Sequence, residues 1–253
     1  MSRPPAPKAP GSTTTGPPLS LIAVVIAVLA VVVAVVVYLA VRDDGEVDQQ
    51  GGDAAQSADA QRSAGALPDG GGLVVNPDVD DVPQVHLYED FQCPFCAQLE
   101  RTSGAAIAQA ATDGEINLTY TFMSFLDDSL GNDSSARAAN AAVCSADAGK
   151  VSTFAEGVFD QQPATEGEGY SDQVFRDVAK DVGIEGTELA TFTSCVQDRS
   201  YAAYVDDMQQ RASQDGVTSS PVVMIDGEPI SDEELSLLLQ DPTSFSTVIA
   251  ARS

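Results

Sequence analysis

Two cysteines separated by two residues, Cys93 and Cys96, are the side chains of this sequence best suited to chemistry. They follow an apolar stretch and precede a helical pattern, so Cys93 would lie at the N-terminus of a helix. Unpaired backbone N–H groups and the helix dipole favour a thiolate there by about 0.3–1 kcal/mol, and a lowered pKa makes a thiol a reactive nucleophile. Cys96 lies one turn further on and can close a small disulfide ring, and Pro94 is tolerated in a first turn. The motif Cys93-Pro94-Phe95-Cys96 therefore predicts a redox-active pair.

Three other interpretations of this motif stay open. A zinc site takes four Cys or His ligands, but the other two cysteines lie far apart and the only histidine is His86. On a central strand, His86 is more often a packed structural residue than a proton carrier. The pair could also be an inert structural disulfide, or belong to a domain that keeps the motif without the activity.

A second candidate element is the dipeptide Ser220-Pro221, which begins a short apolar run. X-Pro bonds adopt the cis form far more readily than other peptide bonds. A cis proline facing a redox pair would leave the backbone of Ser220 free to pair with an extended substrate. An ordinary proline at the start of a strand is an equally good interpretation of this dipeptide alone.

The elements that must position these residues follow from hydrophobic periodicity and turn signals. We expect strands at 73–75, 84–91, 116–125, 221–225 and 228–230. We expect helices at 93–111, 134–147, 150–161, 171–182, 187–197, 199–214 and 241–251. Asp226-Gly227 is a hairpin turn signal, and Ser231 with Glu234 forms a capping box that starts another helix. This order predicts an α/β sheet core with an all-helical insertion at about 132–215.

The first 72 residues have a different composition. Leu19 to Val41 is an uncharged apolar run of 23 residues, long enough to span a bilayer, which predicts one transmembrane helix. A cleaved signal or lipidated precursor is the alternative. Residues 1–18 are predicted to be a disordered cytoplasmic tail, since Arg3 and Lys8 outweigh Arg42 across the membrane. Residues 42–72 are predicted to be a flexible acidic linker, which leaves 73–253 as an extracytoplasmic domain.

The charge of the chain excludes one class of partner. Asp and Glu number 38 against 12 Lys and Arg, which gives a formal net charge of -26. Binding to nucleic acid needs clustered basic side chains, so we expect no nucleic-acid partner. No metal ligands or cofactor motif stand out.

The strings EDFQCPFC and GVTSSPVVMIDGEPI, on either side of the helical block, resemble the DsbA-like branch of the thioredoxin superfamily. The resemblance covers about 82–253. It implies a thioredoxin-like fold with an inserted all-helical subdomain, in an actinobacterial membrane-anchored type of protein. It also implies that Cys93 is the exposed nucleophile, Cys96 the buried resolving thiol and Pro221 a cis proline, and that Ser220 contacts the client chain.

The same resemblance implies an activity. It predicts a thiol–disulfide oxidoreductase that introduces disulfides into exported proteins with free thiols. A membrane protein of the DsbB or vitamin K epoxide reductase type would reoxidise it, and no cofactor is expected. A disulfide reductase or isomerase of the same fold, or a non-catalytic binding module, are the alternatives.

Two residues depart from the family pattern. Phe95 stands where the most oxidising members have His, so we expect a milder oxidant. Leu87 stands six residues before Cys93, where relatives often have an acid that serves the resolving thiol as a proton relay. Glu89 and Asp90 are close by but out of phase, so a relay role is expected for neither.

The two remaining cysteines, Cys144 and Cys195, are expected to pair. Both lie in the helical block, where antiparallel packing could bring them together, and free thiols in an exported domain would be exposed to oxidation. Closing a loop of about fifty residues would contribute about 4 kcal/mol in the chain-entropy picture. Some actinobacterial relatives carry a similar pair. Free buried cysteines, or a second redox relay, are the alternatives.

Overall fold

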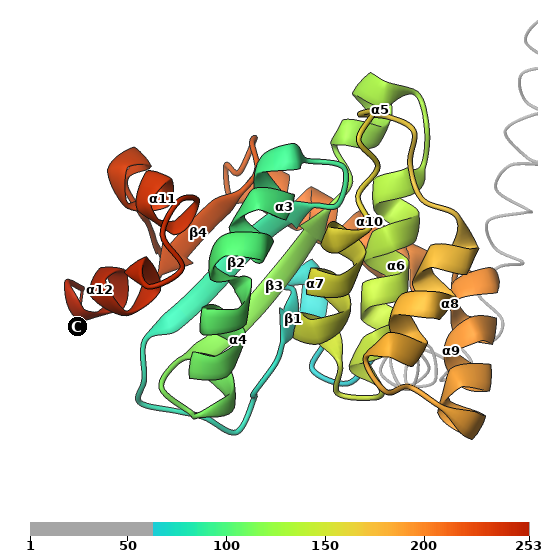
Figure 1. The fold of residues 1–253 in the computed structure, drawn as a ribbon, viewed down its shortest axis with the longest axis horizontal. Helices are drawn as coiled ribbons and strands as arrows, with labels where there is room; N and C mark the ends of the chain where they lie inside the picture. The colour runs from blue at the N-terminus through green and yellow to red at the C-terminus, as the bar shows by residue number, and fades with distance from the viewer. Residues whose placement is uncertain (1–62, 253) are drawn as a thin grey trace, which may run out of the picture. The chain divides into compact units, whose positions relative to one another are not determined.

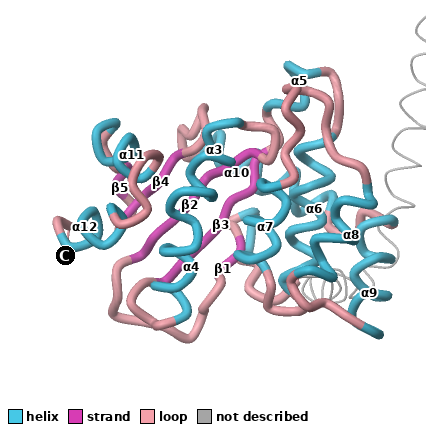
Figure 2. The backbone as a smooth tube through the Cα atoms, viewed as in Figure 1, coloured by secondary structure: helices cyan, strands magenta, loops and turns pink. Residues whose placement is uncertain are grey.

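The computed structural model describes residues 63–252 (Figures 1 and 2). The predicted tail at 1–18, the predicted transmembrane helix at 19–41 and most of the predicted linker lie outside the described residues. Within residues 63–252, no helix combines the length and the apolar character needed to cross a membrane.

Five strands form one mixed sheet in the order β1-β3-β2-β4-β5. They are β1 (Leu73–Val74), β2 (Gln84–Asp90), β3 (Asn117–Met123), β4 (Val222–Ile225) and β5 (Glu228–Pro229). The central strands β2 and β3 are parallel, with Leu87 opposite Tyr120, and the other pairs are antiparallel. Every residue of β3 is buried, because helices cover both faces of the sheet.

One long helix connects β2 to β3. It consists of α3 (Pro94–Leu99), a π-helical turn η2 (Glu100–Gly104) and α4 (Ala105–Thr112), and it lies in front of the sheet in Figure 1. The predicted helix at 93–111 is confirmed, but the π turn within it had no sequence signal. A Cβ atom on Gly104 would come within 2.5 Å of a Glu100 carboxylate oxygen. Glycine at this position therefore makes room for the Glu100 carboxyl inside the fold.

Five helices form a group beside the sheet (Figure 1). They are α5 (Leu126–Leu130), α6 (Ser134–Ala146), α7 (Val151–Asp160), α8 (Asp172–Asp181) and α9 (Gly186–Gln197). Their buried side chains join the core of the sheet in one apolar cluster. The predicted α/β fold with an inserted helical subdomain is confirmed, except that the short α5 was not expected.

Helix α10 (Ala202–Gln214) corrects the predicted end of the insertion at 215. It packs on β3 as the second layer of the sheet, and Val205 and Met208 on its inner face are buried. The backbone N–H of Ser124, just after β3, donates to the Gln209 side chain at 2.8 Å. An amphipathic pattern does not say which surface a helix covers, so the sequence assigned α10 to the wrong layer.

Residues 63–72 are packed, although they were predicted to belong to the linker. The Ser63 hydroxyl is buried and donates to the carbonyl of Val143 at 2.8 Å, and the Tyr204 hydroxyl donates to the carbonyl of Gly72 at 2.7 Å. The segment includes a short 3₁₀ turn, η1 (Pro68–Gly70). Polar contacts rather than bulky apolar side chains hold it, which is why its composition is typical of a linker.

The C-terminal part agrees with its sequence signals. Asp226 and Gly227 have positive φ values of 52° and 81° in the hairpin turn between β4 and β5. Helices α11 (Asp232–Leu238) and α12 (Ser244–Ala250) follow, and the Ser231–Glu234 capping box is present. The Ser103 hydroxyl donates to the carbonyl of Leu238 at 2.7 Å, which ties α11 to the helix that carries the two reactive cysteines.

A disulfide joins Cys144 in α6 to Cys195 in α9, with Cα atoms 6.0 Å apart. The predicted pairing is therefore confirmed. The bridge links two helices of the insertion that are far apart in the sequence.

Candidate active site

Cys93 occupies the N-cap position of α3, and Cys96 lies in the first turn. Both are free thiols, and their exposed fractions are 5% for Cys93 and 0% for Cys96. Cys93 is thus less exposed than the resemblance implied, although Cys96 is the more deeply buried of the two. Among residues 63–252, no three Cys, His, Asp or Glu side chains are placed to hold a metal ion.

The Ser220–Pro221 peptide bond is cis and lies against the first thiol. The Cys93 Sγ lies 3.4 Å from the carbonyl oxygen of Ser220, across a sequence separation of 127 residues, and donates to it when the thiol is protonated. The fold therefore brings together the two elements that the sequence pointed to separately.

The two thiols have opposite electrostatic environments. The pKa of Cys93 is lowered to about 6, chiefly by a hydrogen bond from the Cys96 thiol, with help from the backbone N–H groups of Phe95 and Cys96. Burial raises the pKa of Cys96 well above its usual value. At neutral pH Cys93 is therefore mainly a thiolate and Cys96 a thiol, which gives the first sulfur the nucleophile's role.

This difference predicts the pH dependence of alkylation. In the reduced protein, we expect iodoacetamide to modify Cys93 with a rate that rises to half its maximum at about pH 6. Cys96 should stay unmodified below pH 9, because it is buried and its pKa is raised. Mass spectrometry of peptides from timed reactions at pH 4–9 measures both. A midpoint near the ordinary thiol value of 9.0 would contradict the assigned environment.

The loop that leads into Cys93 is held by a buried carboxylate, Asp90. It accepts hydrogen bonds from the backbone N–H of Gln92 at 2.9 Å, the backbone N–H of Leu126 at 3.1 Å and the hydroxyl of Ser135 at 2.5 Å. Burial raises the pKa of Asp90 to about 6 despite these bonds. The backbone N–H of Cys93 donates to the Asp90 carbonyl at 2.9 Å. Asp90 is therefore a positioning residue for the nucleophile.

Two side chains after α7 support the same loop. The Gln162 amide donates to the carbonyls of Phe91 at 2.9 Å and Cys93 at 3.1 Å. The Tyr170 hydroxyl donates to the carbonyl of Phe91 at 2.7 Å. Sequence reasoning missed both, because they lie about seventy to eighty residues beyond the motif in a segment without regular structure.

The expectation that Glu89 is out of phase with the acidic position of the family, which is occupied here by Leu87, is wrong. Side chains alternate along a strand, so Leu87 and Glu89 point to the same face of β2. Glu89 lies two residues nearer to Cys93 and is fully buried. Its carboxyl contributes to the raised pKa of Cys96, so the resolving thiol does have a buried acid close to it.

Glu89 shares this buried region with Glu100, which the π turn carries inward. Burial raises the pKa of both carboxyls, to about 8 for Glu100, and each affects the other. Both Glu89 carboxylate oxygens, one of Glu100, and the hydroxyls of Tyr120 and Ser152 are buried without a hydrogen-bond partner among the described protein atoms. Two neighbouring carboxyls in a low-dielectric region lose their protons at a higher pH than isolated carboxyls do, and at neutral pH Glu100 is mainly protonated.

The raised pKa of Glu100 predicts a pH dependence of stability. Between pH 4.5 and about 8, the folded chain keeps a proton on Glu100 that the unfolded chain releases, so the free energy of unfolding falls as the pH rises. Glu100→Gln should remove this loss, and the stability difference between variant and wild type should grow with pH by up to about 1.4 kcal/mol per unit. Urea unfolding at pH 5, 6, 7 and 8 measures it, with Glu115→Gln on the surface as the control. Parallel curves for the wild type and Glu100→Gln would contradict the assignment.

His86 lies on the other face of β2, as a packed residue. Its ring stacks on Tyr88 with centroids 4.1 Å apart, and its Nε2 lies 2.8 Å from the Thr121 hydroxyl. Burial lowers the pKa of His86 to about 4, so it is neutral at pH 7. The sequence-based interpretation as a structural histidine is confirmed.

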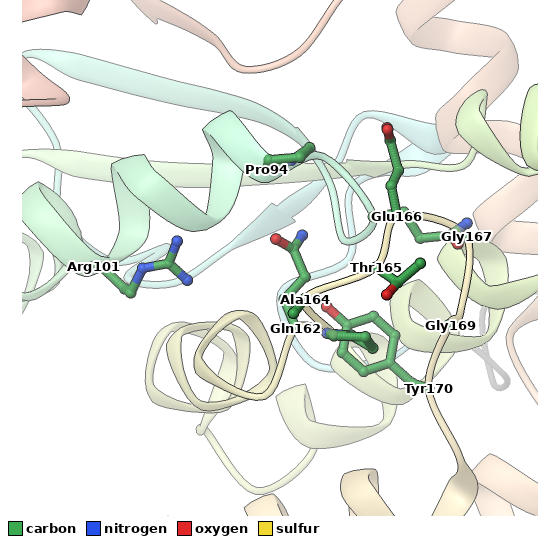
Figure 3. Close-up of a pocket in the computed structure, with 11 residues that line it drawn as sticks. Pro94, Arg101, Gln162, Ala164, Thr165, Glu166, Gly167, Gly169 and Tyr170 are labelled. Atoms are coloured by element: carbon green, nitrogen blue, oxygen red, sulfur yellow. The ribbon is translucent and has the colours of Figure 1, made fainter.

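Two surface features flank the reactive thiols. Phe95, between the cysteines, has 64% of its surface exposed. A pocket of about 230 Å³ lies beside Cys93, lined by Gln92, Pro94 and Arg101 on one side and by the loop after α7 on the other (Figure 3). An exposed apolar side chain and a polar pocket therefore adjoin the nucleophile.

Comparisons with known proteins agree with this geometry. A sequence profile of the family described as thioredoxin matches residues 80–241. Reduced DsbG, a disulfide bond oxidoreductase from Mycobacterium tuberculosis, is 23% identical; the match covers 74% of this chain and 97% of that chain, with a TM-score of 0.56. MdbA, a thiol–disulfide oxidoreductase from Corynebacterium diphtheriae, is 24% identical, with coverages of 72% and 93% and a TM-score of 0.57. MdbA from Actinomyces oris is 18% identical; the match covers 75% of this chain and 95% of that chain, with a TM-score of 0.60.

A comparison with curated protein sequences gives no match. The solved structures establish a shared fold, and the family profile covers more than half of the sequence. The chain therefore belongs to the thioredoxin family, and its fold is that of the DsbA-like thiol–disulfide oxidoreductases.

Proposed function

We propose that this protein is a thiol–disulfide oxidoreductase that introduces disulfides into client proteins through Cys93 and Cys96. The observation that carries the proposal is the pair of thiols itself. One sulfur has a pKa lowered to about 6 and lies against the cis Ser220–Pro221 loop, and its partner is buried with a raised pKa. This asymmetry makes Cys93 the sulfur that exchanges bonds with the client and Cys96 the buried partner that it is joined to in the oxidised protein.

The reaction starts from the oxidised Cys93–Cys96 disulfide. A client thiolate attacks the Cys93 sulfur, forms a mixed disulfide with it and displaces Cys96 as a thiolate, which takes up a proton because its pKa is high. Glu89 is the buried acid that acts on Cys96 and can supply this proton. A second client thiolate then attacks the client's sulfur and displaces Cys93 as a thiolate. Two electrons have passed from the client to the protein.

The direction of transfer follows from the stability of the products. A thiolate with a low pKa stabilises the reduced protein, and a stabilised reduced form makes the disulfide a stronger oxidant. The environment of Cys93 therefore favours oxidation of clients. The side chain of Phe95 has no group that can donate a hydrogen bond to the sulfur, so we place the protein among the milder oxidants.

We place the reaction outside the cytoplasmic membrane. The 23-residue apolar run from Leu19 to Val41 supports a membrane tether, and the basic residues before it support a cytoplasmic N-terminus. A tether would raise the effective concentration of the protein near a membrane oxidant of the DsbB or vitamin K epoxide reductase type. The clients are exported proteins with free thiols.

Refolding of reduced, denatured ribonuclease A tests the proposed function. Sub-stoichiometric oxidised protein, with an oxidant to renew it, should restore ribonuclease activity over many turnovers. The reduction potential, measured against glutathione, separates the alternatives within the fold. A potential near -270 mV, as in thioredoxin, would assign a reductase, and a value well above it an oxidase.

A further inference from the structure

Arg101 has an unusual electrostatic position for this protein. Acids outnumber bases 38 to 12, and most of the basic side chains in residues 63–252 form ion pairs. The Arg101 guanidinium has no carboxylate within ion-pair distance in that part of the chain. Arg101 Nη1 donates a long hydrogen bond of 3.4 Å to the carbonyl of Phe159. Most of its donor capacity is therefore available.

The guanidinium lies at one end of the pocket of about 230 Å³ beside the nucleophile. Figure 3 shows it extending toward Gln162, with Thr165 and Glu166 together on the opposite side of the pocket. Gln162 hydrogen-bonds to the carbonyl of Cys93 at 3.1 Å, so the pocket adjoins the backbone of the nucleophile itself. A client chain bound through its sulfur at Cys93 would have its neighbouring side chains within reach of this pocket.

We propose that this pocket binds an acidic side chain of the client, located within a few residues of the client's reactive cysteine. The inference rests on the proposed function and names a preference among its clients. Arg101 would pair with the carboxylate through its planar guanidinium, which matches a carboxylate with two N–H donors.

The rest of the molecule determines how local this preference is. The net charge of -26 repels acidic clients as a whole, but salt screens exposed charges beyond about 8–10 Å. Glu166, at the far end of the pocket, disfavours a second client carboxylate. The subsite therefore recognises one acidic residue close to the client's cysteine. A high net negative charge elsewhere on the client does not strengthen binding there.

Peptides that are sequence isomers separate position from charge. Three monothiol peptides are compared: one with Asp two residues from its cysteine, one with the same Asp eight residues away, and one with Asn at the near position. In excess, each reduces the oxidised protein, as two peptide thiols become one peptide disulfide. The rate is followed by alkylation of the protein and mass spectrometry. The variants are Arg101→Gln and, as matched control, Arg176→Gln, because Arg176 lies in α8 and does not line the pocket.

Arg101→Gln should lower the rate of reduction by the peptide with the near Asp about fivefold more than the rate with the isomer whose Asp is eight residues away. Arg176→Gln should change the two rates by the same factor. Comparing variants cancels the effect of the near Asp on the peptide's own thiol. Equal effects of Arg101→Gln on the two isomers, or the same selectivity change in Arg176→Gln, would overturn the subsite. Failure of all three peptides, including the neutral one, would instead reject the proposed function.

Discussion

Cys93→Ser should abolish catalysed disulfide formation, lowering the rate of ribonuclease reactivation by at least about a thousandfold to the uncatalysed background. Serine cannot form the mixed disulfide, and a hydroxyl at this position has no accessible anionic form at neutral pH. The thiol also lies at the point where the cis loop and the start of α3 meet, and no other free thiol of residues 63–252 has a lowered pKa. Removing this one atom therefore removes the reaction.

Cys96→Ser is the matched control for this prediction. It keeps the Cys93 thiolate, which can attack a disulfide of an oxidised client and displace one client sulfur as a thiolate, but it removes the thiol that could then displace the client from Cys93. With an oxidised client it should therefore accumulate a mixed disulfide at Cys93, which non-reducing electrophoresis and mass spectrometry detect. Circular dichroism should show both variants to be folded, since serine is close to cysteine in size. A Cys93→Ser protein that still reactivated ribonuclease would assign the domain to non-catalytic binding.

Removing the second cysteine pair, as Cys144→Ala with Cys195→Ala, should lower the free energy of unfolding by about 2–4 kcal/mol. The bridge closes a loop with a sequence separation of 51, and the unfolded chain gains conformational freedom without it. For a domain of this size, each kcal/mol corresponds to about 2–4 °C in Tm, so we expect a decrease of about 4–16 °C. Scanning calorimetry under non-reducing conditions measures this change.

The same double variant distinguishes a structural bridge from a second redox relay. At a temperature well below its Tm, it should reactivate ribonuclease at nearly the wild-type rate, because neither sulfur adjoins Cys93. Alanine at both positions avoids new unpaired polar groups in the insertion. Loss of activity in a folded double variant would show that the pair takes part in electron transfer.

The features that the sequence predicted well are local ones. The thiols at the start of α3, the hairpin at Asp226-Gly227 and the Ser231–Glu234 capping box each depend on residues a few positions apart. Short-range steric and hydrogen-bonding preferences determine such features. The cis bond at Pro221 was predicted through the resemblance, since the dipeptide alone left two interpretations.

The features that were missed depend on contacts distant in the sequence. Glu89 and Glu100 meet only because a π turn, which has no composition signal, rotates Glu100 inward over Gly104. Gln162 supports the Cys93 loop from within the insertion, 69 residues further along the chain. Residues 63–72 were assigned to the linker because their polar anchors on α6 are not apparent from composition.

Helix α6 connects the two cysteine pairs. Ser135 near its start holds the carboxylate of Asp90 before the nucleophile, and Cys144 near its end carries the bridge to α9. A newly synthesised copy has four unpaired thiols and lacks the Cys144–Cys195 disulfide. It is therefore itself a client of the reaction proposed here. Oxidised molecules would form the Cys144–Cys195 disulfide in newly made ones. A fully reduced population supplied only with a slow oxidant would therefore gain activity autocatalytically after a lag. Adding a trace of oxidised protein at the start would abolish that lag.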